Sequence, residues 1–240
     1  MAAIFIGGTG WTLADYYAAA VNALPGDPVG FTTTVFCRVD TQAVASTSRR
    51  LFGQRGTGNP GWNYTLSGTN SSMTLGVGNA SGQASSPASS VVAADVGRLL
   101  LYQGTWEGTT STVRLYAKRV QVGAGSSLPT GYAPDTAVAP MIGRRAPDSP
   151  ADGVTIFGVT YALGIATLAQ LQAQYDAVMA NERMQGVPGL PGLVIDLTAD
   201  IQAAGGTMPA TLTDRGTLGV SFTKTGNPQL APMYSRAWAA

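Results

Sequence analysis

The chain has 240 residues, of which 45% are hydrophobic and 11% are charged, and its formal net charge is +1. This length is enough for one large core, and the near-neutral charge excludes broad electrostatic attraction to nucleic acid or to an anionic membrane. Because the sequence has no histidine and a single cysteine, Cys37, it also excludes a histidine-based nucleophilic triad, a histidine–cysteine metal site and an intramolecular disulfide.

The first element that the sequence predicts is a helix from Trp11 to Leu24. Thr12 is a suitable N-cap residue, and Pro25 followed by a glycine would end the helix. Its apolar face would be formed by residues at helical spacing, namely Leu13, Tyr16, Tyr17, Ala20, Val21 and Leu24.

A series of strands follows this helix. Phe31–Asp40 is the clearest strand, because its threonine, valine and phenylalanine residues alternate between two faces. Turns rich in glycine, serine and asparagine separate the other strands, and residues 78–94 are predicted to form a loop. The other strands are Arg50–Gln54, Trp62–Ser67, Met73–Val77, Leu99–Thr105, Thr112–Val122 and Val154–Tyr161.

A second helix is predicted at Leu168–Asn181, where Thr167 and Gln170 form a capping box at the N-terminus. Glycine and proline alternate with other residues over 186–192, which predicts a linker. The last elements are two strands and a terminal arm, at Leu193–Leu197, Thr217–Thr225 and residues 227–240.

The stretch from Phe31 to Met179 resembles the laminin-G-like, concanavalin-A-like lectin superfamily. Its first strand, FTTTVFCRVD, is similar to the opening strand of that family, and LLLYQGTWEGTTSTVRLYAKRVQVG is similar to the central hairpin. The resemblance implies a mainly β protein, an antiparallel β-sandwich of the jelly-roll type with two short helices. The expected division is an N-terminal segment with a helix (1–28), the sandwich (29–185), and a linker with extra strands and a C-terminal arm (186–240).

Carboxylates are too few and too scattered for hydrolysis of a glycosidic bond. Glycoside hydrolases need two carboxylates close together in space. The only glutamates are Glu107, in a predicted turn, and Glu182, at a predicted helix end. Asp196 and Asp200 stand beside a Gly-rich turn, where capping or solvation is the simpler role. We therefore expect no enzymatic activity.

Calcium is the one cofactor that the resemblance suggests, since sandwiches of this kind often bind it at a loop rim. Asp148 and Asp152 are the candidate ligands, because their oxygens are spaced for a hard cation. The alternative is an ordinary turn, in which these side chains bond their own backbone.

Four aromatic residues lie in or beside predicted loops at one end of the sandwich: Trp62, Tyr64, Trp106 and Tyr132. If they are exposed, they are candidate contacts for a glycan or a protein partner. The alternative for each of them is a place in the core, because burial of an aromatic side chain contributes a large free energy.

Two functions stay open. The low charge, the scarcity of lysine among the cations and the absence of an export signal favour a non-enzymatic structural or decoration protein of a phage-like virion, on its capsid or tail. Such a protein would be made in the bacterial host cytoplasm. It would form a homo-oligomer and bind other virion proteins through its sandwich and terminal arms. The alternative is a carbohydrate-binding module that recognises a receptor or another glycan.

Overall fold

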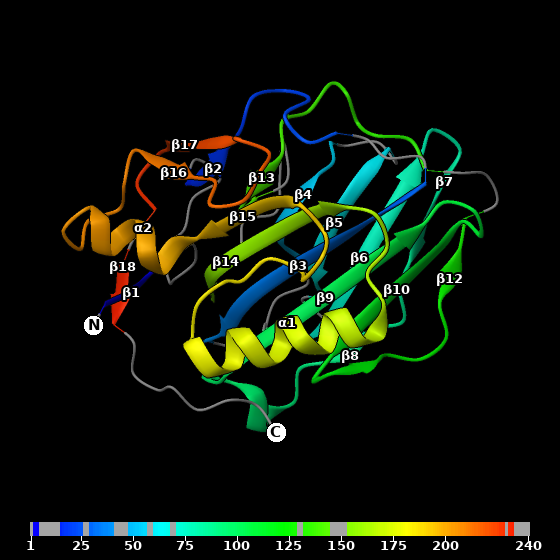
Figure 1. Cartoon of the computed structure of the whole chain (residues 1–240), viewed down its shortest axis with the longest axis horizontal. Helices are drawn as coiled ribbons and strands as arrows, with labels where there is room; N and C mark the ends of the chain where they lie inside the picture. Colours follow the sequence, from blue (N-terminus) through cyan, green and yellow to red (C-terminus); the bar gives the residue numbers. More distant parts are fainter. Residues whose placement is uncertain are drawn as a thin grey trace.

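The computed structural model describes residues 15–25, 29–40, 48–56, 60–67, 71–128, 132–144 and 153–228, together with the backbone of residues 2–4 and 230–232. Within these residues the chain forms two large antiparallel sheets, packed face to face, and two α-helices (Figure 1). The predicted fold class, an antiparallel β-sandwich, is confirmed.

The front sheet has seven strands in the described part of the chain. Its main path runs through β11 (Val120–Gln121), β10 (Thr112–Ala117), β9 (Leu99–Glu107), β3 (Gly30–Val39), β14 (Val154–Leu163) and β15 (Gly192–Asp196), and β12 (Ser126–Ser127) pairs with β10. The predicted strand β3, the hairpin of β9 and β10, and the strand β14 all appear here.

The back sheet has nine strands among the described residues. Its path runs through β16 (Thr211–Thr213), β17 (Ser221–Thr225), β2 (Tyr16–Ala18), β13 (Met141–Ile142), β4 (Arg49–Gln54), β5 (Gly61–Leu66), β6 (Ser72–Asn79) and β7 (Gly82–Ser85), and β8 (Ser89–Ser90) pairs with β6. The prediction of a loop over 78–94 is wrong, because this segment contributes β7, β8 and a 3-10 helix at Ala93–Asp95. These edge strands are short and polar, so they lack the alternating pattern that marks a half-buried strand.

Strand β3 is buried on both of its faces. Val35 and Cys37 point into the main core between the two sheets. Phe36, between them, points the other way into a smaller core beneath helix α1 (Leu168–Asn181). The alternation read from the sequence is therefore correct, and the second face is also covered.

Helix α1 has the predicted bounds and lies across the outer face of the front sheet (Figure 1). Its capping box is also as predicted: the Gln170 backbone N–H donates to Thr167 Oγ1 at 3.3 Å, and the Thr167 N–H donates to Gln170 Oε1 at 2.8 Å. Leu171 and Val178 pack against the sheet, with Gln174 buried between them. None of the described helices is long and apolar enough to cross a membrane.

The first predicted helix is wrong in the part that the structure describes. Tyr16–Ala18 is strand β2, which pairs with β13 and β17. Tyr17 is completely buried, and its hydroxyl donates to the Pro209 carbonyl oxygen at 2.7 Å. Pairing with distant segments overrides the local helical spacing here. Residues 11–14 of the predicted helix lie outside the described residues.

Segments near both ends of the chain belong to the fold. β15 extends the front sheet and β17 the back sheet, while β1 (Ala2–Ile4) pairs with β18 (Leu230–Pro232). Helix α2 (Leu197–Ala203), which was not predicted, begins directly after β15. Asp196 caps it by accepting a hydrogen bond from the Ala199 N–H at 3.2 Å, so the capping role expected of Asp196 is confirmed.

Candidate functional site

The aromatic residues singled out in the sequence belong mainly to the core. Trp62, Tyr64 and Trp106 have no exposed surface, so the idea that they form an open rim is wrong and their alternative assignment to the core is confirmed. They stand at inward positions of alternating strands, and the Tyr64 hydroxyl donates to the Thr33 carbonyl oxygen at 2.7 Å. Tyr132 is half-buried, with its ring edge against Phe31.

The calcium candidates Asp148 and Asp152 lie outside the described residues, so a calcium site there stays a prediction. Within the described ranges, no group of three or more histidine, cysteine, aspartate or glutamate residues is placed to hold a metal ion.

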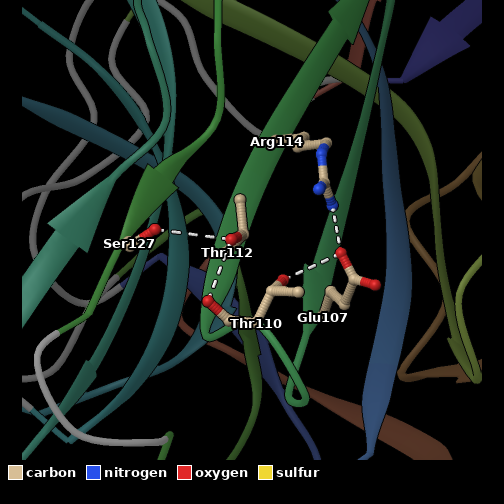
Figure 2. Close-up of polar contacts among 5 residues, drawn as sticks. All are labelled: Glu107, Thr110, Thr112, Arg114 and Ser127. Carbon is tan, nitrogen blue, oxygen red and sulfur yellow. Dashed lines mark hydrogen bonds and ion pairs between the residues drawn. The ribbon is translucent and has the colours of Figure 1, made fainter.

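Glu107, one of the two glutamates, lies at the end of β9 in a polar cluster (Figure 2). Arg114 Nη1 donates to Glu107 Oε2 at 2.8 Å, and the Thr110 hydroxyl donates to the same oxygen at 2.9 Å. These hydrogen bonds hold the pKa of Glu107 below its ordinary value of 4.5. A general acid needs a raised pKa, so the environment of Glu107 is the reverse of what the acid residue of a glycoside hydrolase requires.

The rest of this cluster closes the turn between β9 and β10. The Thr112 hydroxyl donates to the Thr110 carbonyl oxygen at 3.1 Å, and it lies 3.4 Å from the Ser127 hydroxyl of β12 (Figure 2). The polar groups of the cluster thus bond mainly to one another. This arrangement fixes the hairpin and its edge strand rather than presenting groups to a ligand.

The outer face of the back sheet carries a different set of polar groups. The apolar side chains of β5 point into the core, so Asn63 and Thr65, which stand between them, point outward. Strand pairing aligns Asn63 with Gly53 on β4 and with Gly76 on β6. Because neither glycine has a side chain, a depression lies beside Asn63, and the end of the Gln83 side chain reaches over it at Gly76.

Hydrogen bonds join these outward side chains into a line along β5. Arg55 Nη1 donates to Asn63 Oδ1 at 3.4 Å, and Asn63 Nδ2 donates to Thr65 Oγ1 at 2.6 Å. Arg50 Nη1 donates to the same Thr65 oxygen. Asn63 is only 2% exposed and Arg55 only 5%, so both side chains are almost completely covered by their neighbours.

A shallow hollow lies over this line, and we name it the Asn63 hollow. It is a dimple with no enclosed space for a water molecule, and it is lined by Gly53, Arg55, Asn63, Ala139, Met141 and Arg144. The guanidinium of Arg144 also lies over the ring of Tyr16, with 4.8 Å between the guanidinium carbon and the ring centre. The hollow therefore combines a floor of fixed amide and guanidinium groups with a half-buried stacked pair beside it.

The chemical groups of this arrangement are of the kind that oxygen-rich ligands need. The Asn63 amide has both a donor and an acceptor, and guanidinium groups donate several hydrogen bonds in a fixed plane. Groups held in place before binding lose little conformational freedom when a ligand arrives.

Asn63, Arg55 and Arg144 were not predicted as site residues from the sequence. A signal for Asn63 existed, because strand β5 alternates large apolar residues with Gly61, Asn63 and Thr65. Assigning the aromatic residues to the core places Asn63 on the outer face at once. Arg144 has no such signal, since only the pairing of β13 with β4 brings it near the hollow.

The fold is similar to that of a protein from Bacteroides ovatus ATCC 8483 whose carbohydrate-binding role is itself provisional. The TM-score is 0.62 at 14% identity, over 93% of this chain and 60% of that protein. A heptameric SAP-like pentraxin from Limulus polyphemus has a TM-score of 0.48 and 13% identity, over 70% of this chain and 78% of the pentraxin. The NanB sialidase of Streptococcus pneumoniae has a TM-score of 0.49 and 12% identity, over 72% of this chain and 28% of the sialidase. No protein-family model and no curated protein matches the sequence.

At these identities the likeness defines the fold alone. The chain is a protein of the antiparallel β-sandwich class, and its similarity to the Bacteroides protein agrees with the antiparallel sandwich that the sequence predicts. The chain spans 60% of the length of that protein.

Proposed function

We propose that this protein is a non-enzymatic carbohydrate-binding protein and that it binds glycans in the Asn63 hollow. The observation that carries the proposal is the line of fixed polar side chains on the outer face of the back sheet, set between the glycines at 53 and 76. The fold likeness to a protein with a provisional carbohydrate-binding role supports the same reading.

The geometry suits a sugar because a sugar ring presents closely spaced hydroxyl groups on its edges and C–H groups on its faces. Asn63 and Arg55 supply hydrogen-bonding groups at the floor, while Ala139 and Met141 supply apolar surface at the side. The hollow is too small and shallow to enclose a whole glycan. A glycan would therefore lie over the hollow and along the sheet rather than enter it.

A glycan array probed with the full-length protein tests the proposal, followed by titration calorimetry on any glycan bound. We expect Asn63→Ala to lower affinity by about tenfold, the usual scale for losing one good hydrogen-bonding group in a preorganised site. Arg114→Gln, on the opposite sheet, is the matched control and should bind like the wild type. Equal affinity in Asn63→Ala and the wild type would show that glycans bind elsewhere.

The structural role in a phage-like virion, with its associated localisation and partners, stays a prediction of the sequence. That prediction assigns the terminal segments the role of arms that bind neighbouring subunits. In the described backbone, residues 2–4 and 230–232 pair with each other. The fold likeness to a protein with a provisional carbohydrate-binding role supports the carbohydrate-binding reading better than the virion role.

A further inference from the structure

We infer that the ligand is a linear, neutral glycan chain that crosses the strands of the back sheet, from the Asn63 hollow to a patch of hydroxyl groups on β16 and β17. This inference rests on the proposed function and names its ligand class. It comes from the order of residues across the sheet and from the exposed side chains at the end of that order.

One row of directly opposed residues crosses the back sheet from β5 to β16. Residues that stand opposite each other in paired strands point to the same face of a sheet. Tyr17, Phe222 and Leu212, which are chain neighbours of row residues, lie in the main core, so the row lies on the outer face. The row consists of Asn63, Gly53, Met141, Ala18, Thr223 and Thr211.

The far end of the row lies in a group of outward threonine and serine residues, which we name the hydroxyl patch. In the part of the chain that the structure describes, no protein group bonds to the hydroxyls of the patch. Each hydroxyl can therefore give a ligand one donor and two acceptor positions. The patch consists of five exposed residues, Thr211, Thr213, Ser221, Thr223 and Thr225.

A glycan needs the patch because the Asn63 hollow is only a dimple whose polar floor is almost completely covered. Between the hollow and the patch lie Ala18 and Met141, which are half-buried and offer apolar surface. The C–H faces of sugar rings can lie on these two side chains, and the ring hydroxyls can bond to the patch. Beyond the hollow the row has no charged side chain, which matches a neutral chain.

The length of the row sets the length of the ligand. Neighbouring strands are about 4.8 Å apart, which is close to the advance of about 5 Å per ring in an extended glycan. Asn63 and Thr211 are separated by five strand spacings, or about 24 Å. A chain of about five rings therefore spans the row, whereas a single terminal sugar would reach only one end of it.

Titration calorimetry of the full-length protein with linear cello-, xylo- and manno-oligosaccharides, from disaccharides to octasaccharides, tests the inference. In the series that binds, we expect affinity to rise at least about tenfold from the disaccharide to the pentasaccharide and then to level off. Thr211→Val combined with Thr223→Val removes two exposed hydroxyls at nearly constant shape and should abolish most of this rise. Thr109→Val, on the exposed turn between β9 and β10, is the control and should bind like the wild type.

The outcomes separate this inference from the proposed function. Equal affinity for disaccharide and pentasaccharide, with binding still weakened in Asn63→Ala, would overturn the row and leave the hollow as a glycan site. A rise with length that the double valine variant keeps in full would also overturn the row, since the chain would then follow another path. Binding confined to charged or branched glycans on the array would overturn the ligand class. Absence of binding to every glycan would overturn both the inference and the proposed function.

Discussion

The outer faces of the two sheets differ in what lies on them. On the front sheet, helix α1 covers the middle of the outer face and seals a second, smaller core. On the back sheet, the corresponding face carries the Asn63 hollow, with its two glycines and its line of polar side chains. Both faces hold buried polar groups, but those groups have different partners.

Beneath α1, the buried polar groups are satisfied across the helix–sheet interface. Gln174 Oε1 accepts hydrogen bonds from Gln103 Nε2 at 2.7 Å and from Thr34 Oγ1 at 3.0 Å, and its Nε2 donates to the Gln185 carbonyl oxygen at 2.8 Å. In the Asn63 hollow, the side chains bond along a single strand and its neighbour. One buried polar network thus docks a helix onto a sheet, whereas the other lies on the outer face of a sheet, where the proposed function would use it to hold groups ready for a ligand.

Removing the network under α1 is expected to give the largest effect. Gln174→Ala would leave Gln103 and Thr34 buried without their shared acceptor and would open a cavity, at a cost of about 3 kcal/mol in the free energy of unfolding. Urea denaturation would measure it. Gln172→Ala, on the more exposed side of the same helix, is the control and should change stability by less than about 0.5 kcal/mol. A similar small loss in both variants would mean that α1 is held by its apolar residues alone.

The two glycines of the hollow offer a sharper comparison on the back sheet. A Cβ at Gly53 would lie 2.4 Å from the Trp62 carbonyl oxygen and 2.6 Å from the Cα of Asn63, which are backbone atoms that cannot yield. A Cβ at Gly76 would meet chiefly the end of the Gln83 side chain, at 2.7 Å. Gln83 is exposed and flexible, so it can move aside.

Gly53→Ala should therefore lower the free energy of unfolding by about 2–3 kcal/mol, whereas Gly76→Ala should change it by no more than about 1 kcal/mol. Gly76→Ala should nevertheless weaken glycan binding, because the added methyl group narrows the depression beside Asn63. Thermal unfolding and calorimetric titration of the same preparations separate these effects. Unchanged binding in a stable Gly76→Ala protein would place the ligand away from the depression.

Sequence patterns predict the parts of the fold whose signals are local. The capping box of Thr167 and Gln170 is contained within one turn, and it places α1 to the residue. The hairpin of β9 and β10 is likewise set by adjacent segments around a short turn. Strand β2 is the opposite case, because its partners β13 and β17 lie far along the chain and its own residues favour helical spacing.

Local sequence patterns could not predict the candidate site, and the reason is related. The side chains of Asn63, Arg55 and Arg144 come from the region of β4, β5 and β13, and only the strand order of the back sheet brings them together. The aromatic residues could have been assigned from β5 itself. Trp62 and Tyr64 alternate in step with Leu66, which indicates a shared buried face.

The smallest expected effect concerns the part of the front sheet near the hairpin turn, where the Glu107–Arg114 pair lies. Because hydrogen bonds lower the pKa of Glu107 in the folded state, the pair stabilises the protein above pH 4.5, and this contribution is lost as pH falls below that value. Both side chains are about a quarter exposed, so the contribution should be only about 0.5 kcal/mol.

Urea denaturation of Glu107→Gln should show this loss at pH 7 in low salt. At pH 3 the variant should differ little from the wild type. The same is expected in 1 M salt, because charges are then screened within roughly 3 Å. Asp176→Asn breaks the half-exposed pair with Arg119 and should cost less still. A loss in Glu107→Gln that persisted at pH 3 would show that the side chain acts by its shape and hydrogen bonds, and that charge contributes little to closing this hairpin.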